Sequence, residues 1–142
     1  MSYPAWWNKT VTIYNRFEDK DGYVTWHKNV LSGCFVKTTP TFVVSGDVGT
    51  EKTQTIIRIR KSERYVYPVD WATDANKRKS GFTVQNGDII VVGNISDIID
   101  EYENGKRSDD LINKYKSAGS ITVNSFSENT FGALAHYKAV GV

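Results

Sequence analysis

The last third of the chain carries the pattern that most constrains the fold. Residues 82–93 read FTVQNGDIIVVG, two β-rich runs around Asn86-Gly87, a pair that tolerates the positive φ of a tight turn. This pattern predicts a strand, a turn and a buried strand. The apolar residues of the next stretch, 94–102, stand at helical spacing, but the stretch is short enough to be a strand end, so both elements stay open: Ile95, Ile98, Ile99 and Tyr102.

A short α-helix is predicted at about residues 108–117. Ser108 can accept hydrogen bonds from the first-turn amides, and Asp109 and Asp110 oppose the positive helix end. Gly119 can end the helix in a left-handed conformation. One face is apolar and must pack on a core, because so short a helix is not stable alone: Leu111, Ile112 and Tyr115.

A hairpin is predicted at the end of the chain. Residues 120–126 alternate in polarity, residues 129–132 supply a turn, and residues 134–142 alternate again. The residues expected on one face of the first strand are Ile121, Val123 and Ser125, with Phe126 as the apolar exception on the other face.

The first 37 residues predict an antiparallel meander. Residues 9–15 alternate around Val11 and Ile13, which indicates a half-buried strand. Residues 23–27 and 30–37 supply two further strands after a polar turn.

The middle of the chain combines an interrupted segment with a regular strand. Residues 38–53 contain one proline and two glycines, so they predict a long protruding loop or a loose hairpin. Loops of this length are often functional. Residues 55–60 alternate, which turns isoleucine inward and places Arg58 and Arg60 side by side on an exposed face. Residues 68–80 are predicted as a connection with one helical turn.

Composition agrees with a mainly β domain. Threonine, valine and isoleucine dominate the periodic segments, and 142 residues are enough for one domain with a real core. The single cysteine, Cys34, excludes an intrachain disulfide, and its apolar neighbours predict a small buried residue rather than a nucleophile. No stretch approaches the ~20 apolar residues of a membrane span and the first residues lack a signal-peptide pattern, so we expect a soluble protein made in the cytoplasm.

Several patterns fall short of a catalytic or nucleotide site. Residues 46–53 (GDVGTEKT) approach a phosphate-binding loop, but Glu51 stands where that loop needs glycine, and its carboxylate would repel phosphate. His27 and His136 lie in strand patterns without a neighbouring nucleophile or a metal-ligand spacing. Adjacent carboxylates occur on a charged stretch rather than in an aromatic cleft. The sequence therefore indicates no enzyme, no metal and no cofactor.

A net charge of +2 conceals a segregation of charge along the chain. Residues 52–79 hold eight basic residues against three acidic ones, and residues 88–110 hold seven acidic residues against two basic ones. Such runs are commonly solvated faces. The alternative is a subunit whose basic side meets the acidic side of its neighbour in a head-to-tail ring.

Two further binding surfaces are candidates. Trp6 and Trp7 are too apolar for a free terminus, so they either dock onto their own core or bind another subunit. Basic and aromatic residues also combine on β structure, as in barrels that bind single-stranded nucleic acid. An OB-like β-barrel that binds single-stranded nucleic acid is therefore an alternative of another class. The residues concerned are Arg58, Arg60, Lys61, Arg64, Tyr65 and Tyr67.

Three segments share a pattern of strands and turns: residues 10–16 (TVTIYNR), 87–91 (GDIIV) and 125–138 with Asn129, Gly132, His136 and Tyr137. Together they resemble small head-tail connector proteins of tailed bacteriophages, and the likeness spans most of the chain. Within this group the chain looks most like a head-closure, or stopper, subunit. A further segment, residues 105–111 (GKRSDDL), is also similar to prophage connector proteins of Gram-positive hosts.

The resemblance implies a fold, a place and a set of partners. The expected fold is a small antiparallel β-barrel or sandwich with one short α-helix and a long protruding loop. The expected place is the virion neck, where a homo-oligomeric ring lies below the portal and its adaptor, meets the tail terminator or tail tube, and closes the channel around packaged double-stranded DNA, without contact to a membrane. A tail terminator or an adaptor is the alternative within the same group.

Three sets of residues are the candidate contacts. The partner anchor is Trp6 and Trp7. The intersubunit or DNA-channel contacts are Arg58, Arg60, Lys61, Arg64, Asp97, Asp100, Glu101 and Glu103. The gating loop is residues 38–53, with Phe42, Gly46, Asp47, Gly49 and Lys52.

Overall fold

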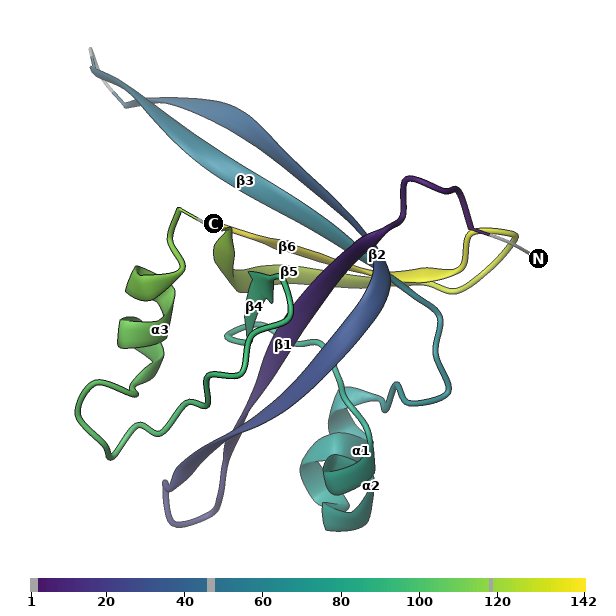
Figure 1. Cartoon of the computed structure of the whole chain (residues 1–142), viewed down its shortest axis with the longest axis vertical. Coiled ribbons are helices and arrows are strands. Elements are labelled where there is room, and N and C mark those ends of the chain that lie inside the picture. Colours follow the sequence, from purple (N-terminus) through teal and green to yellow (C-terminus); the bar gives the residue numbers. More distant parts are fainter. Residues whose placement is uncertain (1–2, 46–47, 118) are drawn as a thin grey trace.

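A closed antiparallel barrel forms the body of the protein, and short helices lie on its outside (Figure 1). The computed structural model describes residues 3–45, 48–117 and 119–142. In barrel order the strands of this part are β1 (Lys9–Glu18), β2 (Val24–Ser45), β3 (Val48–Arg60), β6 (His136–Gly141), β5 (Ser120–Asn129) and β4 (Ile89–Val92), which returns to β1. The helices are α1 (Pro68–Thr73), α2 (Ala75–Ser80) and α3 (Ser108–Lys114). The predicted mainly β class with a small barrel is confirmed.

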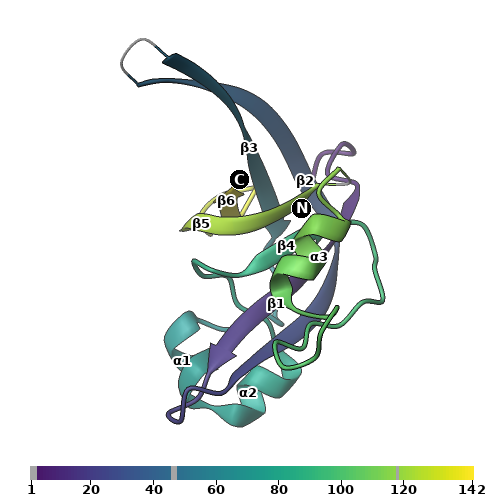
Figure 2. The same ribbon diagram turned by 90° about the vertical axis from the view of Figure 1, so that its left-hand side faces the viewer.

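β1 is buried on both faces, although its alternation predicts a half-buried strand. Val11 and Ile13 belong to the core inside the barrel. Tyr14, on the outer face, is also fully buried and packs with Ile89 and Leu111 beneath α3. Figure 2 shows α3 lying over β4 and β1. The prediction for the outer face is wrong because periodicity along a strand cannot show that a distant helix covers it.

β2 is one strand of 22 residues, where the sequence pattern predicts two. Lys9 pairs with Cys34 but Val11 pairs with Leu31, so a β-bulge accommodates one extra residue of β2 between these pairs. Gly33 takes a φ of 67° at this bulge, which is the left-handed region that glycine adopts without strain. The bulge bends the strand from the β1 ladder into the β3 ladder, so no turn is needed there.

The segment at 38–53 protrudes as predicted, but it is a two-stranded arm and not a loop. β2 and β3 pair as far as Ser45 and Val48. β1 stops pairing with β2 at Cys34, and β6 stops pairing with β3 at Thr55. Beyond these points the hairpin extends away from the barrel with both edges open, as Figures 1 and 2 show. Regular pairing of the two threonine- and valine-rich strands outweighs the proline and glycines in this segment.

Residues 82–85 do not form the predicted strand. Phe82 makes an isolated bridge to Tyr65, and regular pairing begins only at Ile89, after the predicted turn at Asn86-Gly87. Phe82 and its neighbour Val84 are buried in the inner core. Their apolar side chains therefore fill the barrel interior although residues 82–85 have no regular strand pairing. The sequence pattern of such a buried segment looks the same as that of a strand.

The connections around β4 also differ from the sequence pattern. Residues 68–80 contain α1 and α2 rather than one helical turn, because Asp74 caps α2 by accepting from the amides of Asn76 and Lys77. Residues 94–102, for which the sequence allows helix or strand, are irregular, and the chain stays irregular to residue 107.

α3 is confirmed but ends at Lys114, short of the predicted 117, and it is capped differently from the prediction. Ser108 does not accept from the first turn; its amide instead donates to the Glu101 carboxylate at 2.6 Å. The preceding amide, of Arg107, donates to the Asp110 carboxylate at 3.2 Å. Gly119 follows the helix with a φ of 106°, as predicted.

The C-terminal hairpin is confirmed as β5 and β6, with a bulge that the sequence hides. Val123 pairs with Gly141 but Ser125 pairs with Val140, so the register shifts by one residue between them. A shift of one residue exchanges the two faces of a strand. Phe126 consequently packs against the inner core and Ser125 is exposed, the reverse of the predicted faces.

Candidate functional site

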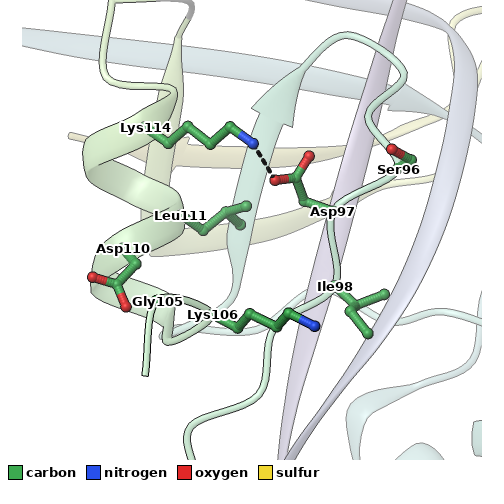
Figure 3. Close-up of a pocket in the computed structure, with 8 residues that line it drawn as sticks. All are labelled: Ser96, Asp97, Ile98, Gly105, Lys106, Asp110, Leu111 and Lys114. Carbon is green, nitrogen blue, oxygen red and sulfur yellow. Dashed lines mark hydrogen bonds and ion pairs between the residues drawn. The ribbon is translucent and has the colours of Figure 1, made fainter. Parts of the chain in front are cut away.

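A hollow of about 400 Å³ lies between the irregular segment 94–107 and α3 (Figure 3). Asp97 and Lys114 meet across it, with Lys114 Nζ donating to Asp97 Oδ2 at 2.7 Å. The Tyr115 hydroxyl donates to Asp97 Oδ1 at 2.5 Å. The bonds from Lys114 and Tyr115 hold the pKa of Asp97 below its usual range. The Asp97 carboxylate is therefore ionised and bound by two donors, which anchors α3 to segment 94–107.

The other predicted acidic contacts are also used inside the chain. Glu101 accepts from the Ser108 amide, and Asp100 Oδ1 accepts from the Tyr102 amide at 2.9 Å. Glu103 forms an ion pair with Lys106 at 3.4 Å. The four predicted acids, Asp97 included, thus lie together in segment 94–107, but their carboxylates hold that segment and the start of α3. Each of the four carboxylates thus has a partner within the chain, and these bonds hold the irregular segment in place.

Asp88 is a buried acid whose role the sequence did not reveal. Asn15 Nδ2 donates to its Oδ2 at 2.7 Å, and the amides of Arg16 and Gln85 donate to its carboxylate at 3.0 and 2.9 Å. Burial raises the pKa of Asp88 to about 7, although these donors act in the opposite direction. The side chain ties β1 to the turn before β4. Its position directly after Asn86-Gly87 and before a buried strand is the signal that marks such a turn-closing acid.

Arg58 and Arg60 share the outer face of β3, as predicted, but that face is partly covered. Arg58 lies over the Phe35 ring, 5.0 Å from its centroid. The Arg60 guanidinium donates to Gly33 O at 2.8 Å and to Trp7 O at 3.0 Å. Both side chains are half-buried. The predicted arginine face is therefore only partly exposed, because Arg58 packs on Phe35 and Arg60 is bound by the N-terminal segment.

The two N-terminal tryptophans differ in burial. Trp7 is 5% exposed and packs against Phe35 and His136. Trp6 is 66% exposed. The hydroxyl of Tyr3 donates to Ala135 O, which holds the segment against the β5–β6 connection. Trp7 thus docks on its own chain, while Trp6 remains available at the surface.

Three of the four predicted basic contacts line one hollow. Arg60, Lys61 and Arg64 surround a space of about 160 Å³ at the end of β3, and Arg58 does not reach it. The aromatic partners expected for single-stranded nucleic acid do not complete this surface. Tyr65 stacks on Tyr137 with ring centroids 3.9 Å apart and donates its hydroxyl to Glu128, so its ring face is occupied. Tyr67 is 60% exposed, and its ring meets the Tyr65 ring edge-on with the centroids 5.9 Å apart.

The predicted gating residues belong to the arm. The backbones of Phe42, Gly49 and Lys52 lie in the β2–β3 ladder. Gly46 and Asp47 lie outside the described residues, as do the side chains of Phe42 and Lys52.

The remaining reactive side chains have structural surroundings. Cys34 is fully buried in the inner core, and burial raises the pKa of its thiol to about 12. His27 packs edge-on against Trp71, and burial together with the nearby Arg78 lowers the pKa of its ring. His136 Nδ1 lies 2.7 Å from Leu134 O. Within residues 3–45, 48–117 and 119–142, no three histidine, cysteine or acidic side chains are grouped to hold a metal ion. None of the helices in the same ranges has the length and apolar character needed to cross a membrane.

Comparison with protein-family models matches residues 6–142 to one family, described as a family of unknown function, DUF6751. The match includes Trp6 and Trp7, the barrel, the arm and α3. No curated protein and no solved structure matches the chain.

Proposed function

The chain belongs to the family of unknown function DUF6751, and we propose that it is a structural subunit of a bacteriophage neck. In this proposal it forms a head-tail connector ring of the head-closure, or stopper, kind, joins the portal and its adaptor to the tail, and helps to close the channel around packaged DNA. Its strand and turn pattern resembles such connectors, and its small β-barrel agrees with that resemblance. A tail terminator or an adaptor is the alternative within the neck.

The two-stranded arm is the observation that carries the proposal. From Thr39 and Gln54 to Ser45 and Val48, no third strand of the described chain lies beside β2 or β3. At ~3.4 Å per residue, this part of the arm extends about 24 Å from the barrel. An isolated two-stranded hairpin is marginally stable in water, and open strand edges promote pairing with other chains. A neighbouring subunit or the tail that covers the arm would stabilise it.

A second unpartnered surface lies at the end of the barrel that carries the N-terminus. Trp6 is exposed there, and Phe131 and Leu134 in the β5–β6 connection are 96% and 42% exposed. Figure 1 shows this connection beside the N-terminal segment, in agreement with the bond between Tyr3 and Ala135. Large apolar side chains gathered at one place indicate a contact surface.

These two surfaces are what a ring requires. A cyclic ring with more than two subunits closes through a heterologous contact, in which one surface of a subunit meets a different surface of its neighbour. The arm and the apolar end of the barrel are two such surfaces on one chain. In this proposal the contact rests on the arm and the apolar end rather than on opposite charges, because three carboxylates of the acidic stretch already accept hydrogen bonds within the subunit.

The proposal is tested by removing the gene from the phage or prophage that encodes it and imaging the particles. We expect DNA-filled heads that leak or lack tails, and restoration of tailed particles when the protein is supplied from a plasmid. In wild-type particles, imaging should place a ring of this subunit between portal and tail.

Measurement of mass in solution provides the second part of the test. The purified protein should form rings alone or when mixed with the portal and adaptor. Tailed, infectious particles made without the protein would overturn the proposal, and so would a protein that stays monomeric with every neck partner and is absent from particles. A ring found only at the tail end would select the tail terminator.

A further inference from the structure

The hollow at the end of β3 has a cationic rim and an apolar floor. Its rim carries Arg60, Lys61 and Arg64 with the hydroxyl-bearing Ser32 and Ser62. The floor is formed by the buried Leu31, Ile59 and Phe82. No acidic side chain lines the hollow. A space of about 160 Å³ with this lining fits one small anionic group.

The cation at the back of the hollow is fixed in place. Two N–H groups of the Arg60 guanidinium bond to the carbonyl oxygens of Gly33 and Trp7. A guanidinium has five N–H donors, so these two bonds leave three others. Because Arg60 is half-buried and held at two points, it can bind an anion without losing further side-chain freedom.

The segment that carries the other two cations is also held in place. The amide of Arg64 donates to Ser62 Oγ at 3.1 Å, and the carbonyl of Arg64 accepts from the Phe82 amide at 3.0 Å. The amide of Lys61 donates to Ala135 O at 3.2 Å. The backbone positions of the rim are therefore set by the barrel, while the Lys61 and Arg64 side chains are exposed at its mouth.

No ion pair within the described residues includes a rim residue: these pairs join Arg16 to Glu18, Lys106 to Glu103, and Lys114 to Asp97. The Arg64 guanidinium donates to the side-chain oxygen of Asn29, a neutral partner that leaves its charge in place. A cationic hollow without an ion pair favours an anion from outside the chain.

We propose that this hollow binds a backbone phosphate of double-stranded DNA. Arginine and lysine are the residues that contact phosphate oxygens, and serine hydroxyls and backbone amides support such contacts. No exposed aromatic ring lines the hollow to stack on a base. The site would therefore recognise the charge and shape of the phosphate and would have no preference for a DNA sequence. The choice of DNA as the source of phosphate rests on the proposed neck function, whereas the anion site itself rests on the residues named above.

The test measures binding of a labelled DNA duplex to the purified protein as a function of salt. The variant Lys61→Glu with Arg64→Glu leaves Arg60, and hence the N-terminal segment, unchanged. We expect this variant to bind at least about tenfold more weakly at low salt, and the slope of log affinity against log salt to fall by about 1, because the hollow holds one phosphate. The matched control is Lys79→Glu with Lys116→Glu, which changes the net charge equally at exposed sites outside the hollow.

The outcomes separate a phosphate site from general attraction and from another partner. Equal weakening in variant and control would show that net charge alone attracts DNA, and would overturn the site. Absence of duplex binding by the wild type at low salt would also overturn it. Equal binding of polyglutamate would assign the hollow to an acidic protein surface and overturn the choice of DNA. Tighter binding of single-stranded than of duplex DNA would have the same effect.

This result and the neck function can fail separately. Loss of DNA binding in a protein that still forms rings in particles would remove the phosphate site and leave the neck function intact. Specific binding by a protein that is absent from particles would keep the site and remove the neck function.

Discussion

At the scale of single residues, Gly81 occupies a position where the neighbouring backbone leaves no room for a side chain. A Cβ on Gly81 would lie 2.5 Å from Arg64 O and 2.6 Å from Val66 Cγ2. The first of these atoms is backbone and cannot move aside without breaking the bond between Phe82 and Arg64. Gly81 thus allows the rim segment to lie against the barrel, a role that its ordinary φ and the sequence do not show.

We therefore expect Gly81→Ala to lower the free energy of unfolding by about 2 kcal/mol or more, because the added methyl group overpacks a site bounded by backbone. Urea denaturation measures the loss. The neighbouring Ser80→Ala is the control, since its hydroxyl makes one exposed bond to Asn76 O; it should change stability by less than about 0.5 kcal/mol. Equal stability of the two variants would show that the backbone relaxes around position 81.

Asp88 makes stability depend on pH in a defined direction. Burial raises its pKa from 3.8 to about 7 in the folded protein. The unfolded chain therefore releases this proton near pH 4, while the folded protein holds it until near pH 7. The contribution to stability is full below pH 4 and is lost as the pH rises to about 7, on the order of 2–4 kcal/mol in total.

The variant Asp88→Asn does not titrate, so it isolates this contribution. We expect the difference in free energy of unfolding between wild type and variant to shift against the wild type as the pH rises from about 4 to about 7. Urea denaturation at a series of pH values measures it, and taking the difference cancels the two histidines. Parallel curves for the two proteins would show that the carboxyl is already ionised at pH 4.

At the scale of elements, turns were more predictable than strands. The turn at Asn86-Gly87 and the positive φ of Gly119 after α3 follow from the backbone freedom of glycine, which is a local property. Strand limits depend on partners far away in the chain. Residues 82–85 have strand composition but no ladder, and β5 reverses its faces at a bulge that only its pairing with β6 reveals.

Local sequence patterns also could not predict that α3 covers β1 and β4. The apolar face of α3 was predicted, but its anchor joins residues 17 or more positions apart, Asp97 to Lys114 and Tyr115. The number of acidic residues in this stretch is visible in the sequence, whereas the hydrogen bonds that their carboxylates accept are not. Charge counts cannot distinguish a free patch from carboxylates that accept backbone amides.

Asp97→Asn should loosen α3 without unfolding the barrel. The variant removes the charge that Lys114 pairs with, and this pair is largely exposed, so we expect a local rather than a global effect. Hydrogen exchange of the α3 amides should become faster, while exchange of the β1 and β3 amides stays the same. Asp109→Asn, which removes an exposed charge of the same helix, should leave exchange in α3 close to wild type. Faster exchange throughout the barrel would instead assign Asp97 a role in global stability.

At the scale of the whole molecule, the sequence predicted a mainly β barrel, because alternation and composition are distributed over the entire chain. It also predicted where the chain protrudes. It did not predict that the protrusion is continuous with two barrel strands, since that follows from where β1 and β6 stop. An arm built from barrel strands transmits a contact at its end directly to the barrel wall, which a loop would not do.

The arm should be dispensable for folding and necessary for assembly. Replacing residues 41–52 by Asn-Gly leaves Pro40 and Thr53 paired and closes the hairpin with a favoured turn. Because the backbone of the removed segment pairs within the arm, beyond the points where β1 and β6 pair with β2 and β3, the thermal midpoint should stay within a few degrees of wild type. Ring formation, measured as mass in solution or in particles, should be lost.

A change confined to residues 46 and 47, again to Asn-Gly, keeps the length of the arm and is the matched control; it should assemble. Assembly of the shortened protein into normal rings would mean that the arm is not the intersubunit contact. In that case the apolar end at Trp6 and Phe131 would remain as the candidate, and Trp6→Ser would be expected to weaken the ring because it removes the largest exposed apolar side chain from that end.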